Sequence, residues 1–197
     1  MNEEKLRRRY GGHVPGLLGA EEAFAVLCPL VGDSLLFEVR AANLRQGGEV
    51  CFPGGRVERG ESPAACALRE TEEELSIPRE TVEILGLGDF ICNQRGFLLQ
   101  PVVGIVSREG MARLRPSPAE VAEAFLAPLS FFRETEPSVY YCDLLPHPPG
   151  DLPYESLGIS RDYPWSRGRI EIPVWRYEGR TIWGMTARLV RDLVKGG

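Results

Sequence analysis

The sequence predicts an α/β fold in which helices pack against a sheet within one domain. Segments typical of strands and segments typical of helices follow one another along the chain, which is the pattern of a layered α/β sandwich. A length of 197 residues suits one domain with a full core and is too short for two comfortable ones. With 43% hydrophobic and 26% charged residues, the composition is ordinary for a globular protein. We therefore expect residues 1–197 to form a single domain.

Two strands near the start of the chain form the first predicted hairpin. The run AFAVLCPLV (23–31) and the run SLLFEVR (34–40) are rich in aliphatic and aromatic residues, and Gly32-Asp33 between them is a hairpin signal. The next segment, RQGGEVCFPGGRVERGES, is dense in glycine and is expected to be a loop. A short strand at 50–52 is predicted inside it.

A helix is predicted to begin at Pro63. The hydroxyl of Ser62 can cap its N-terminus, and proline is favoured at the first helical position. The helix should run to about Leu75 and end before Pro78, because proline cannot continue it.

Further strands and helices are predicted in the second half of the chain. Strands are expected at 81–90 and 97–106. The segment SPAEVAEAF (117–125) is expected to be a helix, with Ser117 as its cap and Pro118 at its first position.

A later segment contains the run LPHPPGDLP, which resists both helix and strand. Residues 143–168 are rich in proline and glycine and are too long for an ordinary connection, so they should be functional or disordered. We expect this segment to cover a substrate cleft or an oligomer interface, the latter in a homodimer. A strand (169–177) and a closing amphipathic helix (181–194) are predicted after it.

Charge and composition exclude several classes of partner. A net charge of −5 gives no general attraction to nucleic acid or to an anionic membrane. No apolar run approaches the length of a transmembrane helix, and the first residues, MNEEKLRRRYGG, lack the apolar core of a secretory signal. The 5 cysteines are scattered without metal-binding spacing. Together these features predict a cytoplasmic protein.

The stretch RETEEEL at 69–75 places four glutamates on the predicted helix. Glu70 and Glu74 are four residues apart, where like charges repel, and they lie near the helix C-terminus, where the helix dipole disfavours negative charge. Acidic runs on helices are usually solvated faces, and that interpretation stays open from the run alone. Stability, however, does not explain acids in this half of the helix.

The helical period separates a core stripe from an acidic face. Four residues share the stripe that would face the core: Ala64, Leu68, Thr71 and Leu75. Three acids fall on another face: Glu70, Glu73 and Glu74. Arg69 can pair with Glu73 one turn away. The preceding glycine-rich loop lets backbone approach a ligand, and Mg²⁺ takes carboxylate and carbonyl oxygens. A magnesium site would cancel the repulsion between the acids.

These residues resemble a known motif. Gly55 is followed after five residues by Glu61, after seven more by Arg69 and the acidic run, and then by Leu75-Ser76-Ile77. The spacing resembles the Nudix box, a loop–helix–loop motif of diphosphate hydrolases, here at residues 55–77. The resemblance implies a Nudix α/β/α sandwich with a mixed sheet. Thr71 replaces the usual aliphatic residue, and Ser76 replaces the glycine that ends the helix.

The resemblance also implies roles for individual residues. Glu70 and Glu74 would be the principal ligands of Mg²⁺ or Mn²⁺, and Glu73 would bind a further metal or help to activate water. Glu61 would support the site, and Arg69 would orient the glutamates.

Two further positions complete the implied catalytic set. The backbone carbonyl near Gly54 is another candidate metal ligand. The general base is either a glutamate of the box or a carboxylate from a later loop, for which Glu120 is the candidate.

The segment before the box resembles the coenzyme A diphosphatase branch of the Nudix superfamily. RAANLRQGGEVCFPGG matches it at several positions, which makes Arg40, Arg45, Gly48 and Gly55 candidate substrate-binding residues. Arginine suits bidentate recognition of phosphate, although both arginines could equally be ordinary surface residues. Glu38 departs from the pattern, because threonine is common at its position.

The leading hypothesis is therefore a Mg²⁺- or Mn²⁺-dependent hydrolase with a small-molecule substrate. It would cleave coenzyme A or its thioesters to 3′,5′-ADP and (acyl-)phosphopantetheine. One alternative is a Nudix diphosphatase for ADP-ribose, a nucleoside diphosphate sugar, NADH or a nucleotide. A remote alternative is a Nudix domain that binds a ligand without turnover.

Overall fold

The computed structural model describes residues 2–13, 18–19, 22–93 and 96–195. In this part of the chain a main sheet of 8 strands is joined by a smaller sheet of 3 strands. The strands of the main sheet are β1 (Glu22–Val31), β2 (Ser34–Arg40), β3 (Val50–Cys51), β4 (Gly54–Arg56), β5 (Val82–Leu87), β6 (Ile91–Cys92), β7 (Phe97–Val106) and β8 (Val121–Pro128).

The main sheet is mixed. β1 and β7 run parallel, from Glu22 opposite Phe97 to Leu30 opposite Ile105. All the other described strand pairs in this sheet are antiparallel, with the order β3-β2-β1-β7-β5 and with β4 beside β1, β6 beside β7 and β8 beside β2. The predicted hairpin of β1 and β2 is confirmed, and so is the short strand β3.

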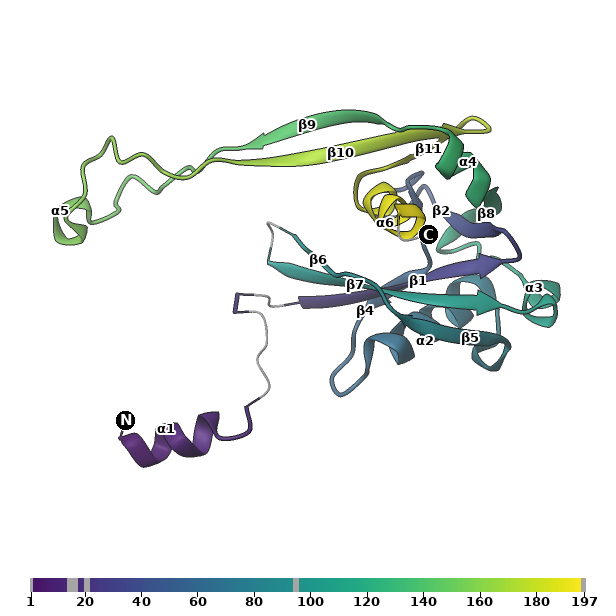
Figure 1. The fold of residues 1–197 in the computed structure, drawn as a ribbon, viewed down its shortest axis with the longest axis horizontal. Coiled ribbons are helices and arrows are strands. Elements are labelled where there is room, and N and C mark those ends of the chain that lie inside the picture. Colours follow the sequence, from purple (N-terminus) through teal and green to yellow (C-terminus); the bar gives the residue numbers. More distant parts are fainter. Residues whose placement is uncertain (1, 14–17, 20–21, 94–95, 196–197) are drawn as a thin grey trace.

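Both faces of this sheet are covered by helices. Successive side chains of a strand point to opposite faces. Accordingly Leu36 packs in a core with residues of α2 (Pro63–Leu75), whereas Phe37 packs in a second core with residues of α6 (Gly184–Lys195). Figure 1 shows α2 on one side of the sheet and α6 on the other. The predicted α/β/α sandwich with a mixed sheet is confirmed.

The predicted helix α2 is confirmed at both ends. The Ser62 hydroxyl accepts a hydrogen bond from the backbone N–H of Ala65 at 3.2 Å, and Pro63 occupies the first position. Ser76 ends the helix in the left-handed conformation, at φ 57° and ψ 25°. Its hydroxyl donates to the carbonyl of Arg115 at 2.9 Å, which anchors a residue whose backbone conformation is unfavourable for a side chain.

The helix predicted at 117–125 is wrong, because most of this segment belongs to strand β8. The carbonyl of Ser117 accepts hydrogen bonds from the N–H groups of Glu120 and Val121, and this closes a turn instead of starting a helix. From Val121 the chain pairs with β2, and Phe125 enters the core opposite Phe37. Serine followed by proline begins turns as readily as helices, and a partner strand decided the outcome.

The smaller sheet forms a long arm. β9 (Ser138–Leu144) and β10 (Gly168–Tyr177) are antiparallel, and β11 (Arg180–Trp183) pairs with the end of β10. The closing helix is confirmed, but it begins at Gly184, and the first residues predicted for it form β11. We call residues 138–177 the arm and its irregular end, residues 145–167, the tip.

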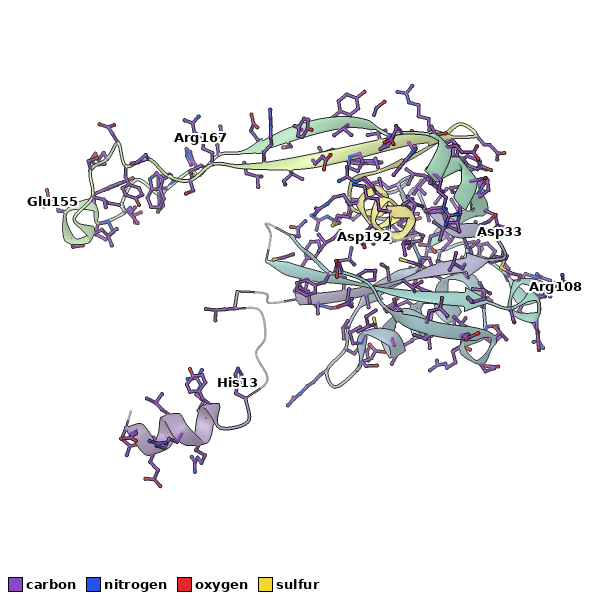
Figure 2. The ribbon with its side chains drawn as sticks, in the orientation of Figure 1. His13, Asp33, Arg108, Glu155, Arg167 and Asp192 are labelled. Atoms are coloured by element: carbon purple, nitrogen blue, oxygen red, sulfur yellow. The ribbon has the colours of Figure 1, made fainter. Side chains whose placement is uncertain are left out.

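The arm projects from the body of the molecule. Figure 1 shows it on the same side of the main sheet as α6, with its tip extending far beyond the sheet. Figure 2 labels Glu155 and Arg167 on this extension. At the base of the arm, the indole N–H of Trp175 donates to the carbonyl of Thr135 at 2.7 Å, and the ring is buried. The base is therefore anchored in the core while the tip is exposed.

The remaining described helices are short or peripheral. They are α1 (Glu3–Tyr10), the 3₁₀ turn η1 (Arg79–Thr81), α3 (Arg108–Arg113), α4 (Leu129–Glu134) and α5 (Tyr154–Leu157). None of the helices formed by the described residues combines the length and the apolar character needed to cross a membrane.

Candidate metal-binding site

The helix α2 places Glu74 in the interior. The sequence put this residue on an outer acidic face, but only 4% of it is exposed. The reason is that β4 packs beside the helix, and the backbone N–H of Gly54 donates to Glu74 Oε2 at 2.8 Å. Burial raises the pKa of Glu74, and the negative charge of Glu38 raises it further. An inward-facing carboxylate with this environment is poorly explained as a solvated surface charge.

Arg69 organises the other acids of the box. It donates to both oxygens of Glu61, at 3.0 and 3.2 Å, and to Glu70 Oε1 at 2.8 Å. Its predicted pairing with Glu73 is also present, at 3.2 Å. Hydrogen bonds from Arg69 and from the backbone of Glu58 lower the pKa of Glu61 to about 2. Arg69 therefore bridges Glu61 and Glu70.

Glu70 and Glu73 differ in their surroundings. Burial raises the pKa of Glu70, although its contact with Arg69 acts in the opposite direction. The side chain of Glu73 is 57% exposed. Glu73 is therefore the member of the predicted acidic face that is open to solvent.

Gly54 and Gly55, in β4 before α2, let neighbouring groups approach the backbone closely. A methyl group on Gly54 would overlap the carbonyl of Ala25 and the backbone of Val26, and its φ of 157° is unusual for other residues. A methyl group on Gly55 would instead overlap the carboxylate of Glu70. Gly54 thus lets β4 pair closely with β1, and Gly55 leaves room for the Glu70 side chain.

Glu120 lies near the acids of α2 although it belongs to a distant part of the sequence. It is exposed at the turn before β8, and its carbonyl accepts a hydrogen bond from the N–H of Ala41 at 2.8 Å. Its negative charge raises the pKa of both Glu70 and Glu74. The structure therefore places this predicted candidate beside the box, but on a turn and not on the expected helix.

Sequence reasoning assigned no role to Glu38, which lies on β2. It is 1% exposed, and its Oε1 accepts a hydrogen bond from the thiol of Cys51 at 3.3 Å. Its Oε2 has no hydrogen-bond partner among the described residues. The available signal was an acidic residue inside the apolar run SLLFEVR.

Three of the candidate substrate-binding residues, Arg40, Arg45 and Gly48, lie at the end of β2 or in the loop that follows it, and the fourth, Gly55, lies in β4. The N–H of Gly48 donates to the carbonyl of Arg40 at 2.9 Å, so Gly48, with φ 83°, closes the base of this loop. The positive charge of Arg40 lowers the pKa of Glu38, which places Arg40 near the acids. Arg45 is exposed in the loop itself.

The donor set suits a hard divalent cation. Four carboxylates interact through their charges: Glu38, Glu70, Glu74 and Glu120. Mg²⁺ and Mn²⁺ prefer such oxygens, and a cation would relieve their repulsion. Within the described ranges, no three His, Cys, Asp or Glu side chains already converge as a complete cation site. Glu70 and Glu74 are hydrogen-bonded to Arg69 and to the backbone of Gly54, respectively.

Two surface hollows lie elsewhere. One of about 330 Å³ is lined by residues such as Glu80, Val82 and Ser107, and one of about 250 Å³ by residues such as Phe90 and Arg188. Neither contains an acid of the box. The candidate site is therefore identified by its buried carboxylates and not by either surface hollow.

The family model and the curated relatives that match this sequence agree with the motif. Residues 22–137 match the family model described as the NUDIX domain. The chain is 36% identical over 179 residues to "Uncharacterized Nudix hydrolase NudL" from Citrobacter koseri, covering 86% of this chain and 79% of that protein. It is 43% identical over 117 residues to "Nudix hydrolase 3" from Caenorhabditis elegans, covering 56% of this chain and 49% of that protein. A solved NUDIX hydrolase from Nitrosomonas europaea superposes with a TM-score of 0.48 at 20% identity, covering 60% of this chain and 63% of that chain.

Proposed function

The chain belongs to the NUDIX domain family, and from this premise we propose that it is a metal-dependent diphosphate hydrolase of coenzyme A or acyl-coenzyme A. The products would be 3′,5′-ADP and (acyl-)phosphopantetheine. One observation carries the metal-dependent part of the proposal: Glu74 is buried and Glu70 is partly buried, and further negative charges act on both. A divalent cation is the partner that this arrangement lacks.

Four charged residues of the box, and the residue before it, have defined roles in this proposal. Glu70 and Glu74 hold Mg²⁺ or Mn²⁺, and the carbonyl near Gly54 is a further candidate ligand. A bound cation would neutralise charge on the diphosphate and lower the pKa of the attacking water. Arg69 keeps Glu70 oriented through its 2.8 Å contact, and Glu61 keeps Arg69 in place.

Two candidates remain for the group that accepts a proton from the attacking water. Glu73 is open to solvent while held by Arg69, and Glu120 is exposed beside the box. A general base must exchange its proton with solvent after each turnover, and both residues meet this condition.

The choice of coenzyme A rests on the segment before the box. Coenzyme A carries a 3′-phosphate and a diphosphate, and Arg40 lies at the base of the loop that Gly48 closes, with Arg45 in the loop itself. The alternatives are ADP-ribose, a nucleoside diphosphate sugar, NADH or a nucleotide as substrate, or ligand binding without turnover. The complete set of box glutamates favours an enzyme over a binding domain.

Product analysis tests the proposal. Coenzyme A incubated with the protein and Mg²⁺ should yield 3′,5′-ADP and phosphopantetheine in equal amounts, measured by mass spectrometry. Removal of the divalent cation with a chelator should abolish both products. Cleavage that continues undiminished with chelator present would refute the metal-dependent mechanism.

The adjacent glycines give a matched pair of substitutions. Gly54→Ala should lower the free energy of unfolding by about 2 kcal/mol or more, because its methyl group would meet rigid backbone. Gly55→Ala should leave stability nearly unchanged, because only the end of the Glu70 side chain must move. It should lower turnover roughly tenfold by displacing that carboxylate. Denaturant unfolding and steady-state turnover on both variants check this contrast, and a reversed pattern would contradict it.

The arm gives the basis for a predicted homodimer. Tyr140 and Tyr141 on β9 are each more than half exposed, as are Leu145 and Leu157 near or within the tip. Exposed apolar side chains concentrated on one element are typical of an interaction surface. Because the tip lies on the α6 side of the main sheet, away from α2, we favour the interface role over a cover for the box (Figure 1).

Light scattering after size-exclusion chromatography measures the oligomeric state directly. The full chain should have the mass of two protomers, and a variant with residues 145–167 replaced by a short turn should have the mass of one. An unchanged unfolding midpoint in the trimmed variant controls for damage to the body. A monomeric full chain would contradict the interface role.

We also propose that the protein is cytoplasmic, in keeping with its 5 cysteines, each with a free thiol.

A further inference from the structure

Glu38 is a buried acidic residue that the proposed mechanism does not yet use. It lies in β2 with 1% of its surface exposed. One carboxylate oxygen accepts a hydrogen bond from the Cys51 thiol, and the other, Oε2, has no hydrogen-bond partner among the residues that the structure describes. A buried carboxylate oxygen without a partner is strongly unfavourable in a folded protein. Some group that binds to this oxygen is therefore expected.

The strand geometry directs Glu38 toward the box helix. Leu36, two residues earlier, packs in the core that contains α2, and alternate residues of a strand share a face. Phe37 and Val39 pack in the other core, on the α6 side. Glu38 therefore faces α2 and not α6.

Charge interactions place the same carboxylate among the acids of the site. After burial, the charge of Glu38 is the largest cause that raises the pKa of Glu74. The charges of Glu70 and Glu120 in turn raise the pKa of Glu38. Charge interactions thus connect a carboxylate on β2, two on α2 and one in the turn before β8.

We propose that Glu38 is an additional ligand of the divalent cation, with Oε2 as the donor atom that joins Glu70 and Glu74. The inference rests on the proposed metal-dependent function and extends it to a residue outside the box. It gives the unpartnered oxygen a partner of opposite charge. Because a hard cation accepts several carboxylate oxygens, a third carboxylate needs no change in the kind of metal.

A purely structural role for Glu38 explains only one of its two carboxylate oxygens. Glu38 could be neutral and serve to hold Cys51 at the start of the box loop. A protonated carboxyl group is also a hydrogen-bond donor, however, and among the described residues Oε2 has no acceptor. The Cys51 contact uses only Oε1. A structural role therefore leaves the second oxygen unexplained, whereas a cation accounts for it.

Mn²⁺ binding to the folded, substrate-free protein tests the proposal without relying on activity. The electron paramagnetic resonance signal of free Mn²⁺ gives the dissociation constant for the wild type and for Glu38→Gln. Glutamine keeps the size of the side chain but removes its charge. We expect the dissociation constant of Glu38→Gln to rise at least about tenfold, because even residues that only support a ligand change metal affinity by about this factor.

The matched control is Glu123→Gln. Glu123 lies on β8 opposite Val39, so it shares the face of Val39 and points away from the site, where it pairs with Arg180. Its substitution should leave Mn²⁺ affinity unchanged. Glu70→Gln serves as the positive control and should weaken binding.

Unfolding of the metal-free proteins separates the two roles of Glu38. Removal of a repelling buried charge should leave the unfolding midpoint of Glu38→Gln unchanged or raised, and Mn²⁺ should raise it less than in the wild type. A lowered metal-free midpoint with a normal Mn²⁺ response would show a structural role and overturn the proposal. If Glu38→Gln does not fold, Glu38→Asp decides, because it keeps the charge but shortens its reach and should still weaken binding.

The outcomes distinguish this inference from the proposed function. If the wild type and Glu38→Gln bind Mn²⁺ equally tightly while Glu70→Gln binds weakly, only the role of Glu38 is overturned. If the wild type binds no Mn²⁺, the metal-dependent function and this inference fail together.

Discussion

Glu70→Gln and Glu74→Gln should each lower turnover of coenzyme A at least about a hundredfold, because each removes a charged ligand from the cation that drives hydrolysis. Glutamine keeps the size and most contacts of each side chain. At position 74 its amide oxygen can still accept the hydrogen bond from the N–H of Gly54. The expected loss therefore reflects charge and not a collapse of the loop.

Stability measurements complete this prediction. Both substitutions remove negative charge from a repelling set, so the metal-free proteins should be as stable as the wild type or slightly more stable. Glu72→Gln is the matched control on the same helix, since Glu72 pairs with Arg79 at 2.6 Å, outside the acidic set. It should retain normal turnover. Near-normal turnover in both Glu70→Gln and Glu74→Gln would remove the basis for the metal-ligand assignment.

Substitution of Arg40 or Arg45 by alanine should give the second-largest effect. If one of them binds the 3′-phosphate, its loss should lower kcat/KM for coenzyme A by about ten- to a hundredfold, the usual range for a charged hydrogen bond of roughly 1.5–3 kcal/mol. The loss should appear mainly as a higher KM. Arg45 gives the simpler test, because the charge of Arg40 also acts on Glu38.

Dephospho-coenzyme A provides the complementary change in the ligand. It lacks the 3′-phosphate, so the relevant alanine variant should process it about as well as the wild type does. The losses from removing the phosphate and the arginine should therefore not add. Arg108→Ala, at the α3 end of the main sheet in Figure 2, should change neither substrate. Fully additive losses at both Arg40 and Arg45 would show that neither residue reads the 3′-phosphate.

The elements nearest to the box were the most predictable from sequence. Helix α2 carries its own boundary signals in Ser62 and Pro63, and the hairpin of β1 and β2 carries its turn in Gly32-Asp33. These signals are local, so a single sequence suffices to read them. The pairing of Arg69 with Glu73 was predictable for the same reason, since it depends only on helical spacing.

Features that depend on distant partners were harder to predict. The segment at 117–125 has a helix-like start, but pairing of Val121–Pro128 with β2 makes it a strand. Glu74 was expected on an outer face, and β4 buries it. The arm depends on pairing between β9 and β10 across the irregular tip, which no local pattern indicates.

Glu38 illustrates what a motif search passes over. In the sequence, Glu38 stands out only because threonine is common at its position in the coenzyme A diphosphatase branch. Its place in the predicted strand suggests a core position. The fold places Glu38 opposite α2. There its Oε2 has no hydrogen-bond partner among the described residues, and its charge raises the pKa of Glu74. If Glu38 binds the cation as proposed, the site extends beyond the contiguous motif.

The most direct measurement of the central claim is kcat/KM for four substrates in the presence of Mg²⁺: coenzyme A, ADP-ribose, NADH and a nucleoside triphosphate. Chromatographic separation of each substrate from its cleavage products reports turnover of each. The proposed function predicts that coenzyme A has the highest kcat/KM, by at least about tenfold, which corresponds to roughly 1.4 kcal/mol of additional transition-state stabilisation. A higher value for any of the other three would contradict the choice of substrate, and no turnover of all four would contradict the assignment as a hydrolase of these diphosphates.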